Sequence, residues 1–233
     1  MSEMPPMPPS AIPPPSPTVL PWEEPTAGFG SIFPTVVEFV TAPFQAFGKM
    51  SLTIDLVRPI AYFVVFALFN VAIGQVWRFI FWSPGTSGME LIPKEIFQQA
   101  PWLQSLIARP SLVVVAVLMV IAPLVNLIFL FIWSGIIHLF LMMVGGAASG
   151  FAATLRVICY SQTAGIAAIV PFLGGIIQLV WGLVLQIMGL SQAHRTSGGK
   201  AAFAVIGPLV LCCGCIIVLA IAGATAFKGM LNH

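Results

Sequence analysis

Between Leu56 and Lys228 the chain consists mainly of apolar runs, several of them long enough to cross a lipid bilayer and nearly free of charge. Charged residues make up 7% of the whole sequence. Soluble domains carry about a quarter. Such a chain lacks the charged groups that a surface facing water requires. We therefore expect an integral membrane protein whose solvent is the bilayer.

The apolar runs predict an all-α, polytopic membrane bundle with five transmembrane helices. A helix needs about 20 apolar residues to cross the hydrocarbon layer. The second run is longer than this, so its helix should tilt, kink or project, and Pro123 is the expected kink. The predicted spans are 56–81, 111–144, 151–170, 174–191 and 201–227. Two short amphipathic pieces, 93–99 and 101–107, are expected in the connection after the first span.

The part of the chain before the spans divides into two predicted regions. Residues 1–28 are rich in proline and are expected to be disordered. Residues 29–50 have apolar side chains at helical spacing, which predicts an amphipathic helix that lies in the membrane surface or packs on the bundle. Pro43 should break or restart this helix. The membrane domain would then occupy 51–228.

One face of the predicted N-terminal helix is rich in phenylalanine and valine. These side chains are spaced so that they share one side of the helix, with polar residues largely between them. Such a face suits contact with lipid or with a partner protein. The candidate face comprises Phe29, Phe33, Val37, Val40, Phe44 and Phe47.

Polar side chains inside the predicted spans form a second candidate site, because polar groups in a bilayer are costly and often functional. Their helical spacing predicts stripes that face one another, since lipid offers them no partner. The spacing leaves open whether these stripes line a cavity. The candidate cluster comprises Asn126, Ser134, His138, Arg156, Tyr160, Gln178 and Gln186.

The sequence has no aspartate or glutamate after Glu95. Arg156 therefore cannot pair with a carboxylate from the last four spans, and we expect it to reach lipid phosphate or helix-end carbonyl groups. Proton-coupled transport usually needs carboxylates within the membrane, so it is disfavoured. Acid–base catalysis by a carboxylate pair is disfavoured for the same reason.

Other chemistry finds little support in the sequence. Ser134 and His138 are four residues apart and could form a hydrolase dyad, but a structural hydrogen bond between them is the favoured interpretation. The four cysteines lie in apolar runs and are expected to pack rather than bind metal. The basic residues are spread along the chain, which argues against a nucleic-acid surface. We expect no enzyme activity, no cofactor and no metal.

Two stretches, read together, resemble a known family of membrane domains. The first contains Pro21-Trp22-Glu23, then residues 39–50 and 58–62. The second contains residues 151–161 and 169–175, followed by Trp181, Gly189-Leu190, His194 and residues 199–201. In this order and spacing, the stretch from 20 to 225 resembles a bacterial-type member of the Yip (Ypt/Rab-interacting protein) membrane-domain family.

The resemblance implies a five-span bundle with a cytoplasmic N-terminal region, which we expect in the inner (plasma) membrane of a bacterium. Eukaryotic members are linked to Rab GTPases and vesicle traffic, but their Asp-Leu-Tyr-Gly-Pro pattern is absent from this sequence. No catalytic residue carries over.

The expected function is therefore that of a non-enzymatic scaffold or interaction module. Its expected partners are membrane lipids and a protein of unknown identity, and a homo-oligomer is left open. The alternative is a transporter or permease component with a polar intramembrane cavity. A Ser–His intramembrane hydrolase is a third, less favoured hypothesis.

Overall fold

The computed structural model describes residues 19–52, 55–81, 94–99 and 111–231, and within these ranges it contains helices and no strand. The all-α fold class is thereby confirmed. The 3-10 helices are η1 (Pro21–Glu23), η2 (Phe29–Ser31) and η4 (Gln162–Ile169). The α-helices are α1 (Ile32–Thr41), α2 (Pro43–Lys49), α3 (Val57–Phe81), α4 (Lys94–Gln99), α6 (Leu112–Met143), α7 (Gly150–Ser161), α8 (Gly174–Ala193) and α9 (Gly198–Leu231).

Four helices, α3, α6, α8 and α9, are long and apolar enough to cross a membrane. The predicted third span is divided between α7, with 12 residues, and η4, with 8 residues. At about 1.5 Å per residue for α-helix and 2.0 Å for 3-10 helix, the two segments have a combined length of roughly 34 Å. That length is close to the thickness of the hydrocarbon layer, although α7 alone is too short.

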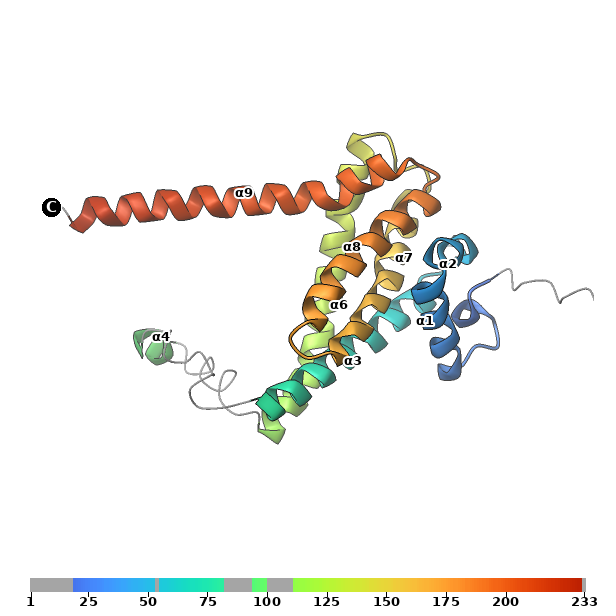
Figure 1. Ribbon diagram of the computed structural model, residues 1–233, viewed down its shortest axis with the longest axis horizontal. Coiled ribbons are helices and arrows are strands. Elements are labelled where there is room, and N and C mark those ends of the chain that lie inside the picture. The colour runs from blue at the N-terminus through green and yellow to red at the C-terminus, as the bar shows by residue number, and fades with distance from the viewer. Residues whose placement is uncertain (1–18, 53–54, 82–93, 100–110, 232–233) are drawn as a thin grey trace, which may run out of the picture.

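Helices α3, α6, α7 and α8 pack side by side, whereas α9 crosses the end of this group and then projects away from it (Figure 1). The first part of α9 contacts α6 and α8. Beyond Pro208 the helix is exposed from Val210 to Leu219, and most of these side chains are apolar. The exposed apolar surface of α9 fits a lipid environment.

Pro123, the expected kink of the second span, lies inside α6 without ending that helix.

The core lies around α7, in which every residue from Ala153 to Ser161 is buried. Gly189 of α8 makes this close packing feasible. A Cβ at Gly189 would lie 2.6 Å from Val157 Cγ1 and 2.7 Å from Phe47 Cε1. Helices α2, α7 and α8 therefore approach one another at a position where only glycine leaves enough room.

The N-terminal helices form two separate pieces joined at Ala42. Ala42 leaves the helical conformation, with φ −143° and ψ 58°, and Pro43 begins α2. Proline disfavours the helical conformation of the residue before it, which explains the break. The break expected at Pro43 is thus confirmed. It turns the predicted helix 29–50 into η2, α1 and α2.

Residues 19–28 are ordered, so the prediction of a disordered tail is wrong for this part of the chain. Leu20 and Trp22 are buried in the core. Trp22 also donates from its backbone N–H to Thr35 Oγ1 (3.0 Å). The remaining part of the predicted tail, 1–18, lies outside the described residues, as does the amphipathic piece 101–107. The piece 93–99 corresponds to α4.

Candidate functional site

Glu23 is the centre of a buried polar cluster that joins the N-terminal segment to α7. Its Oε1 atom lies 2.8 Å from Arg156 Nη1 and accepts a second hydrogen bond from Tyr160 Oη at 2.8 Å. Its Oε2 atom accepts from the backbone N–H of Ser51 at 2.6 Å. The side chains of Arg156 and Glu23 are only 2% and 4% exposed. We call Glu23, Ser51, Arg156 and Tyr160 the Glu23 cluster.

The position of Arg156 overturns the expectation that it reaches lipid phosphate. Its guanidinium is buried, pairs with Glu23 and donates through Nη2 to the carbonyl of Asp55. The sequence excluded a carboxylate partner only from the last four spans, whereas Glu23 belongs to the segment before α1. A buried cation needs such a partner, because an unpaired charge away from water is very costly.

Arg58 holds the same N-terminal segment on the start of α3. It donates through Nη1 to the carbonyls of Trp22 (3.2 Å) and Ala27 (2.9 Å). The Trp22 indole N–H donates to the carbonyl of Arg58 at 2.7 Å. The guanidinium carbon also lies 5.6 Å from the centre of the Trp22 ring, within the range of a cation–π contact. Two arginines thus attach the segment around Glu23 to the bundle.

A second polar group lies at the end of the bundle where α8 turns into α9. The backbone N–H of Ser149 donates to His194 Nδ1 at 3.1 Å. In neutral histidine the hydrogen is then on Nε2, which lies 2.9 Å from Thr154 Oγ1. The Thr154 hydroxyl can in turn donate to His138 Nδ1 at 2.8 Å. These bonds assign one consistent direction of donation from Ser149 to His138.

His194 is held in its neutral form. Burial, together with the nearby His138 ring, lowers the pKa of His194 to about 4. The neutral form is also the one that can accept the hydrogen bond from Ser149. His194 therefore serves as a fixed hydrogen-bonding group at neutral pH rather than as a cation.

The expected hydrogen bond between Ser134 and His138 is not formed. Ser134 Oγ is buried and has no hydrogen-bond partner in the part of the chain that the structure describes. His138 Nδ1 instead faces Thr154. The i, i+4 spacing places both residues on one helix face, but the nearest suitable partner of His138 is on α7.

The amide side chains of the candidate cluster border small cavities between the helices. Asn126 and Gln178 border a cavity of about 280 Å³, together with Asn70 and Gln162. Gln178 and Gln186 border another of about 260 Å³. Gln186 Oε1 also accepts from the Trp133 indole N–H at 3.2 Å. The structure thus separates the predicted cluster into the Glu23 cluster, the histidine group, the amide cavities and the isolated Ser134.

The candidate apolar face is exposed on η2, α1 and α2, except at one residue. Phe29 and Phe33 are 78% and 75% exposed, and Val37, Val40 and Phe44 are exposed as well. Phe47 is only 2% exposed and packs in the core, so its inclusion in the face was wrong. A continuous helix would keep Phe47 on the same side as the other five residues. The break at Ala42 starts a separate helix, α2, so this register no longer applies to Phe47. We call the other five residues the α1–α2 face.

Reasoning from the sequence missed Glu23, Thr154, His194 and Asn70 as site residues. For Glu23 a usable signal was present. All seven acidic residues precede position 96, and an arginine within an apolar span requires one of them or an exit to water. Thr154 and Asn70 carry no such signal, because a lone threonine or asparagine in a span is satisfied in many ways.

Together, these features define a multi-pass helical membrane protein whose N-terminal helices are attached to the bundle by buried ionic and hydrogen-bonded contacts. Residues 37–220 match the Yip1 domain. This match covers well over half of the chain, and the chain belongs to the Yip1-domain family, which confirms the resemblance found in the sequence. No curated protein and no solved structure matches the chain.

Proposed function

We propose that this protein is a non-enzymatic interaction module of the Yip type, in which the membrane bundle presents the α1–α2 face to a partner protein at the membrane surface. The observation that carries this proposal is the contrast in exposure along η2 and α1. Phe29 of η2 and Phe33 of α1 are exposed, while Val36 and Phe39 of α1 are buried in the core.

The α1–α2 face is held in a fixed position, which favours recognition. Phe39 stacks on Tyr160 with ring centres 5.4 Å apart, and it contacts Phe47 at 4.8 Å. The Lys49–Glu38 ion pair at 3.1 Å links α2 to α1. A face that is already ordered loses little conformational entropy on binding. Burying one phenylalanine or valine side chain fully is worth about 1.5–3 kcal/mol, so five of them provide a substantial driving force.

We further propose that the N-terminal helices lie on the cytoplasmic side of a bacterial inner membrane. The end of the bundle that carries α2 also carries the turns after α6 and α8 (Figure 1). Lys49, Arg195 and Lys200 belong to this end, and cytoplasmic segments are usually enriched in lysine and arginine. A scaffold with this orientation would act in membrane organisation or a trafficking-like process.

The test is in-membrane cross-linking, followed by mass spectrometry, of the wild type and of the triple variant Phe33→Asp, Val37→Asp, Phe44→Asp. We expect the variant to lose its cross-linked protein partners while the bundle stays folded, because its changes lie on exposed positions. Gln45→Asp is the matched control, since it places a carboxylate at an exposed polar position of α2. Unchanged partners in the triple variant would contradict the proposal.

A pathway for a polar solute is the second candidate function. Gln178 borders three cavities, of about 540, 280 and 260 Å³, so amide groups follow one another through the bundle. Tyr160 and His138, which were expected to line the same path, are engaged in the Glu23 cluster and with Thr154. Solute uptake into proteoliposomes that is lost in Gln178→Leu would support this candidate. If no such uptake is measured, the interaction module remains the proposed function.

A further inference from the structure

The two amide cavities lie among α3, α6, η4 and α8. Gln162 of η4 and Gln178 of α8 border both cavities, whose volumes are about 280 and 260 Å³. Helices α6 and α8 each pack on α7. Across the space between them, Trp133 of α6 donates from its indole N–H to Gln186 Oε1 of α8 at 3.2 Å. The cavities therefore lie in a cleft between two apolar helices that are each long enough to cross a membrane.

Three amide side chains that border these cavities are without a hydrogen-bond partner in the part of the chain that the structure describes. They are those of Asn126, Gln162 and Gln178. Asn70 borders the first cavity as well, but its amide already donates to the carbonyl of Phe66 at 2.8 Å. An amide has two N–H donors and one carbonyl acceptor, and leaving such groups unpaired away from water is costly. A bound molecule with hydrogen-bonding groups would satisfy the three amides.

The lining of the amide cavities is uncharged. No aspartate, glutamate, lysine, arginine or histidine is among the described residues that border them. An ion at this place would lack a partner of opposite charge, which is very costly within a bilayer. Amide groups both donate and accept hydrogen bonds, so they suit the oxygen atoms of carbonyl and hydroxyl groups. The lining thus favours an uncharged molecule and disfavours one that carries a phosphate.

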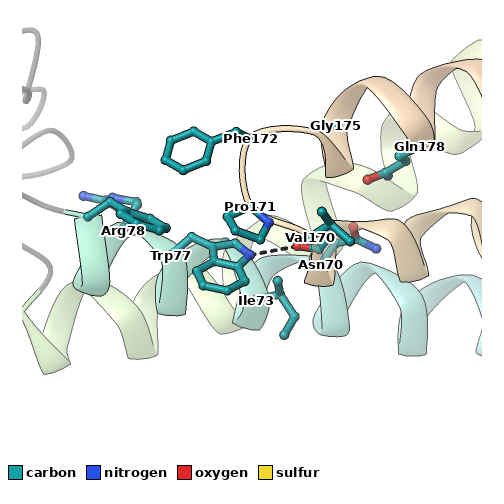
Figure 2. A pocket seen from close by; sticks show the side chains of 12 residues that line it. Asn70, Ile73, Trp77, Arg78, Val170, Pro171, Phe172, Gly175 and Gln178 are labelled. Carbon is teal, nitrogen blue, oxygen red and sulfur yellow. Dashed lines mark hydrogen bonds between the residues drawn. The ribbon is translucent and has the colours of Figure 1, made fainter.

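The amide cavities open on the side of the bundle that faces lipid. Asn126 lies near the middle of α6 and is exposed. Leu179, which borders the second cavity, is 61% exposed. Figure 2 shows Gln178 at one end of the neighbouring cavity of about 540 Å³, away from Trp77 and Arg78 near the end of α3. A molecule dissolved in the hydrocarbon layer can therefore reach the amides from the side, at a depth that excludes a charged head group.

We propose that the amide cavities bind the head group of one uncharged lipid. Its carbonyl or hydroxyl oxygens pair with the amides of Gln162 and Gln178, and its apolar chain leaves past Leu179 into the bilayer. Isoprenoid quinones and diacylglycerols share this chemistry, since each has a small oxygen-bearing head on an apolar chain. Each cavity is close to the lower limit of ligand sites, about 300 Å³, which suits a small head group. The site is separate from the α1–α2 face and requires no solute to cross the membrane, so it depends on neither function proposed above.

Native mass spectrometry of the purified full chain tests the proposal. The protein is titrated separately with menaquinone, with diacylglycerol, with phosphatidylglycerol of the same acyl chains, and with squalene, an isoprenoid hydrocarbon that has no oxygen. We expect one molecule of menaquinone or of diacylglycerol to bind, and the tighter of the two identifies the head group. Squalene and phosphatidylglycerol should bind at least about tenfold more weakly, because squalene forms no hydrogen bond and phosphatidylglycerol carries a charge.

Replacing the amides by apolar side chains of similar size separates the cavities from the rest of the apolar surface. Gln162→Leu and Gln178→Leu should each weaken binding about tenfold, because a buried oxygen of the lipid loses its partner. Without lipid, both variants should be at least as stable as the wild type in thermal unfolding, since an unpaired amide is removed. Gln45→Leu is the matched control, because Gln45 is exposed on α2, and it should leave binding unchanged.

Four results would overturn the proposal. Binding of neither menaquinone nor diacylglycerol would leave the three amides without the proposed ligand. Equal binding of squalene would indicate apolar contact alone, and equal binding of phosphatidylglycerol would exclude selection for an uncharged head group. Unchanged binding in the double variant Gln162→Leu, Gln178→Leu would exclude the amide cavities as the site. None of these results bears on the α1–α2 face, whose own test is the loss of cross-linked protein partners.

Discussion

Glu23 and Arg156 form a buried ion pair at 2.8 Å although 133 residues separate them in the chain. The pair joins a segment outside the spans to the most buried helix of the bundle. Because both side chains are almost fully buried, neither charge can turn to water when its partner is lost. The attachment of the N-terminal helices, and with them the α1–α2 face, therefore depends on this contact.

Removing the carboxylate should destabilise the protein strongly. Glu23→Gln removes the carboxylate that pairs with the buried Arg156, and breaking one side of a buried pair typically costs about 3–5 kcal/mol. Thermal unfolding in detergent, followed by intrinsic tryptophan fluorescence, measures the loss. Glu24→Gln is the matched control, because Glu24 is exposed and the same charge is removed. Equal stability of the two variants would contradict the assigned role of Glu23.

The interaction itself can be separated from the loss of either partner. In a double-mutant cycle, Glu23→Gln combined with Arg156→Met should be less destabilised than the sum of the single variants, because no unpaired charge remains. A coupling free energy near zero would show that Glu23 and Arg156 act independently.

A larger side chain at Gly189 should weaken the junction of α2, α7 and α8. Gly189→Ala places a methyl group less than 3 Å from Val157 and Phe47, both in the core. Overpacking of this kind typically costs about 1–3 kcal/mol. Gly135→Ala is the control in another helix, since a Cβ there meets nothing within 4 Å. The thermal unfolding temperature should fall only for Gly189→Ala.

The stability of the α8–α9 turn should depend on pH through His194. Its pKa is about 4 in the folded chain, below the ordinary value of about 6.5 expected after unfolding. As pH falls between these values, the unfolded chain binds the proton more readily. The stability contributed by neutral His194 is therefore complete above pH 6.5 and is lost toward pH 4. Unfolding measured across this range should show a smaller pH dependence in His194→Gln than in the wild type.

The proposed orientation predicts opposite reporter signals from two turns. A fluorescent protein fused after Thr196 should fold in the cytoplasm, whereas alkaline phosphatase fused after Phe172 should be active outside it. The physical reason is that Arg195 and Lys200 flank the first of these turns, and positive charge is retained in the cytoplasm. The reverse pattern would place the α1–α2 face on the outer side.

The helical spans were predictable because each depends on a local property. The predicted ranges 56–81 and 174–191 correspond closely to α3 (Val57–Phe81) and α8 (Gly174–Ala193). The length and apolar character of a segment decide whether it can satisfy its backbone in lipid. The change from α7 to η4 was not predictable in this way, because it occurs where the segment packs against α3 and α8.

The polar sites were predictable only as a set of residues. The polar positions within the spans identified Arg156, Tyr160 and His138 as groups in need of partners, but the sequence assigned Arg156 to lipid phosphate or helix-end carbonyl groups and His138 to Ser134. Arg156 and Tyr160 instead meet Glu23, and His138 meets Thr154. Spacing along one helix shows which side of that helix a residue lies on. A hydrogen bond depends in addition on how close that side comes to a second segment of the chain.

The amino-acid sequence alone determined that this chain resides in a bilayer and where its apolar segments begin and end, because the free energy of transferring a segment into lipid is a sum over neighbouring residues. The tertiary structure decided which charged and amide groups meet and which apolar side chains stay exposed. Those outcomes depend on how distant helices pack, as at Gly189, where the absence of a side chain lets three helices come together.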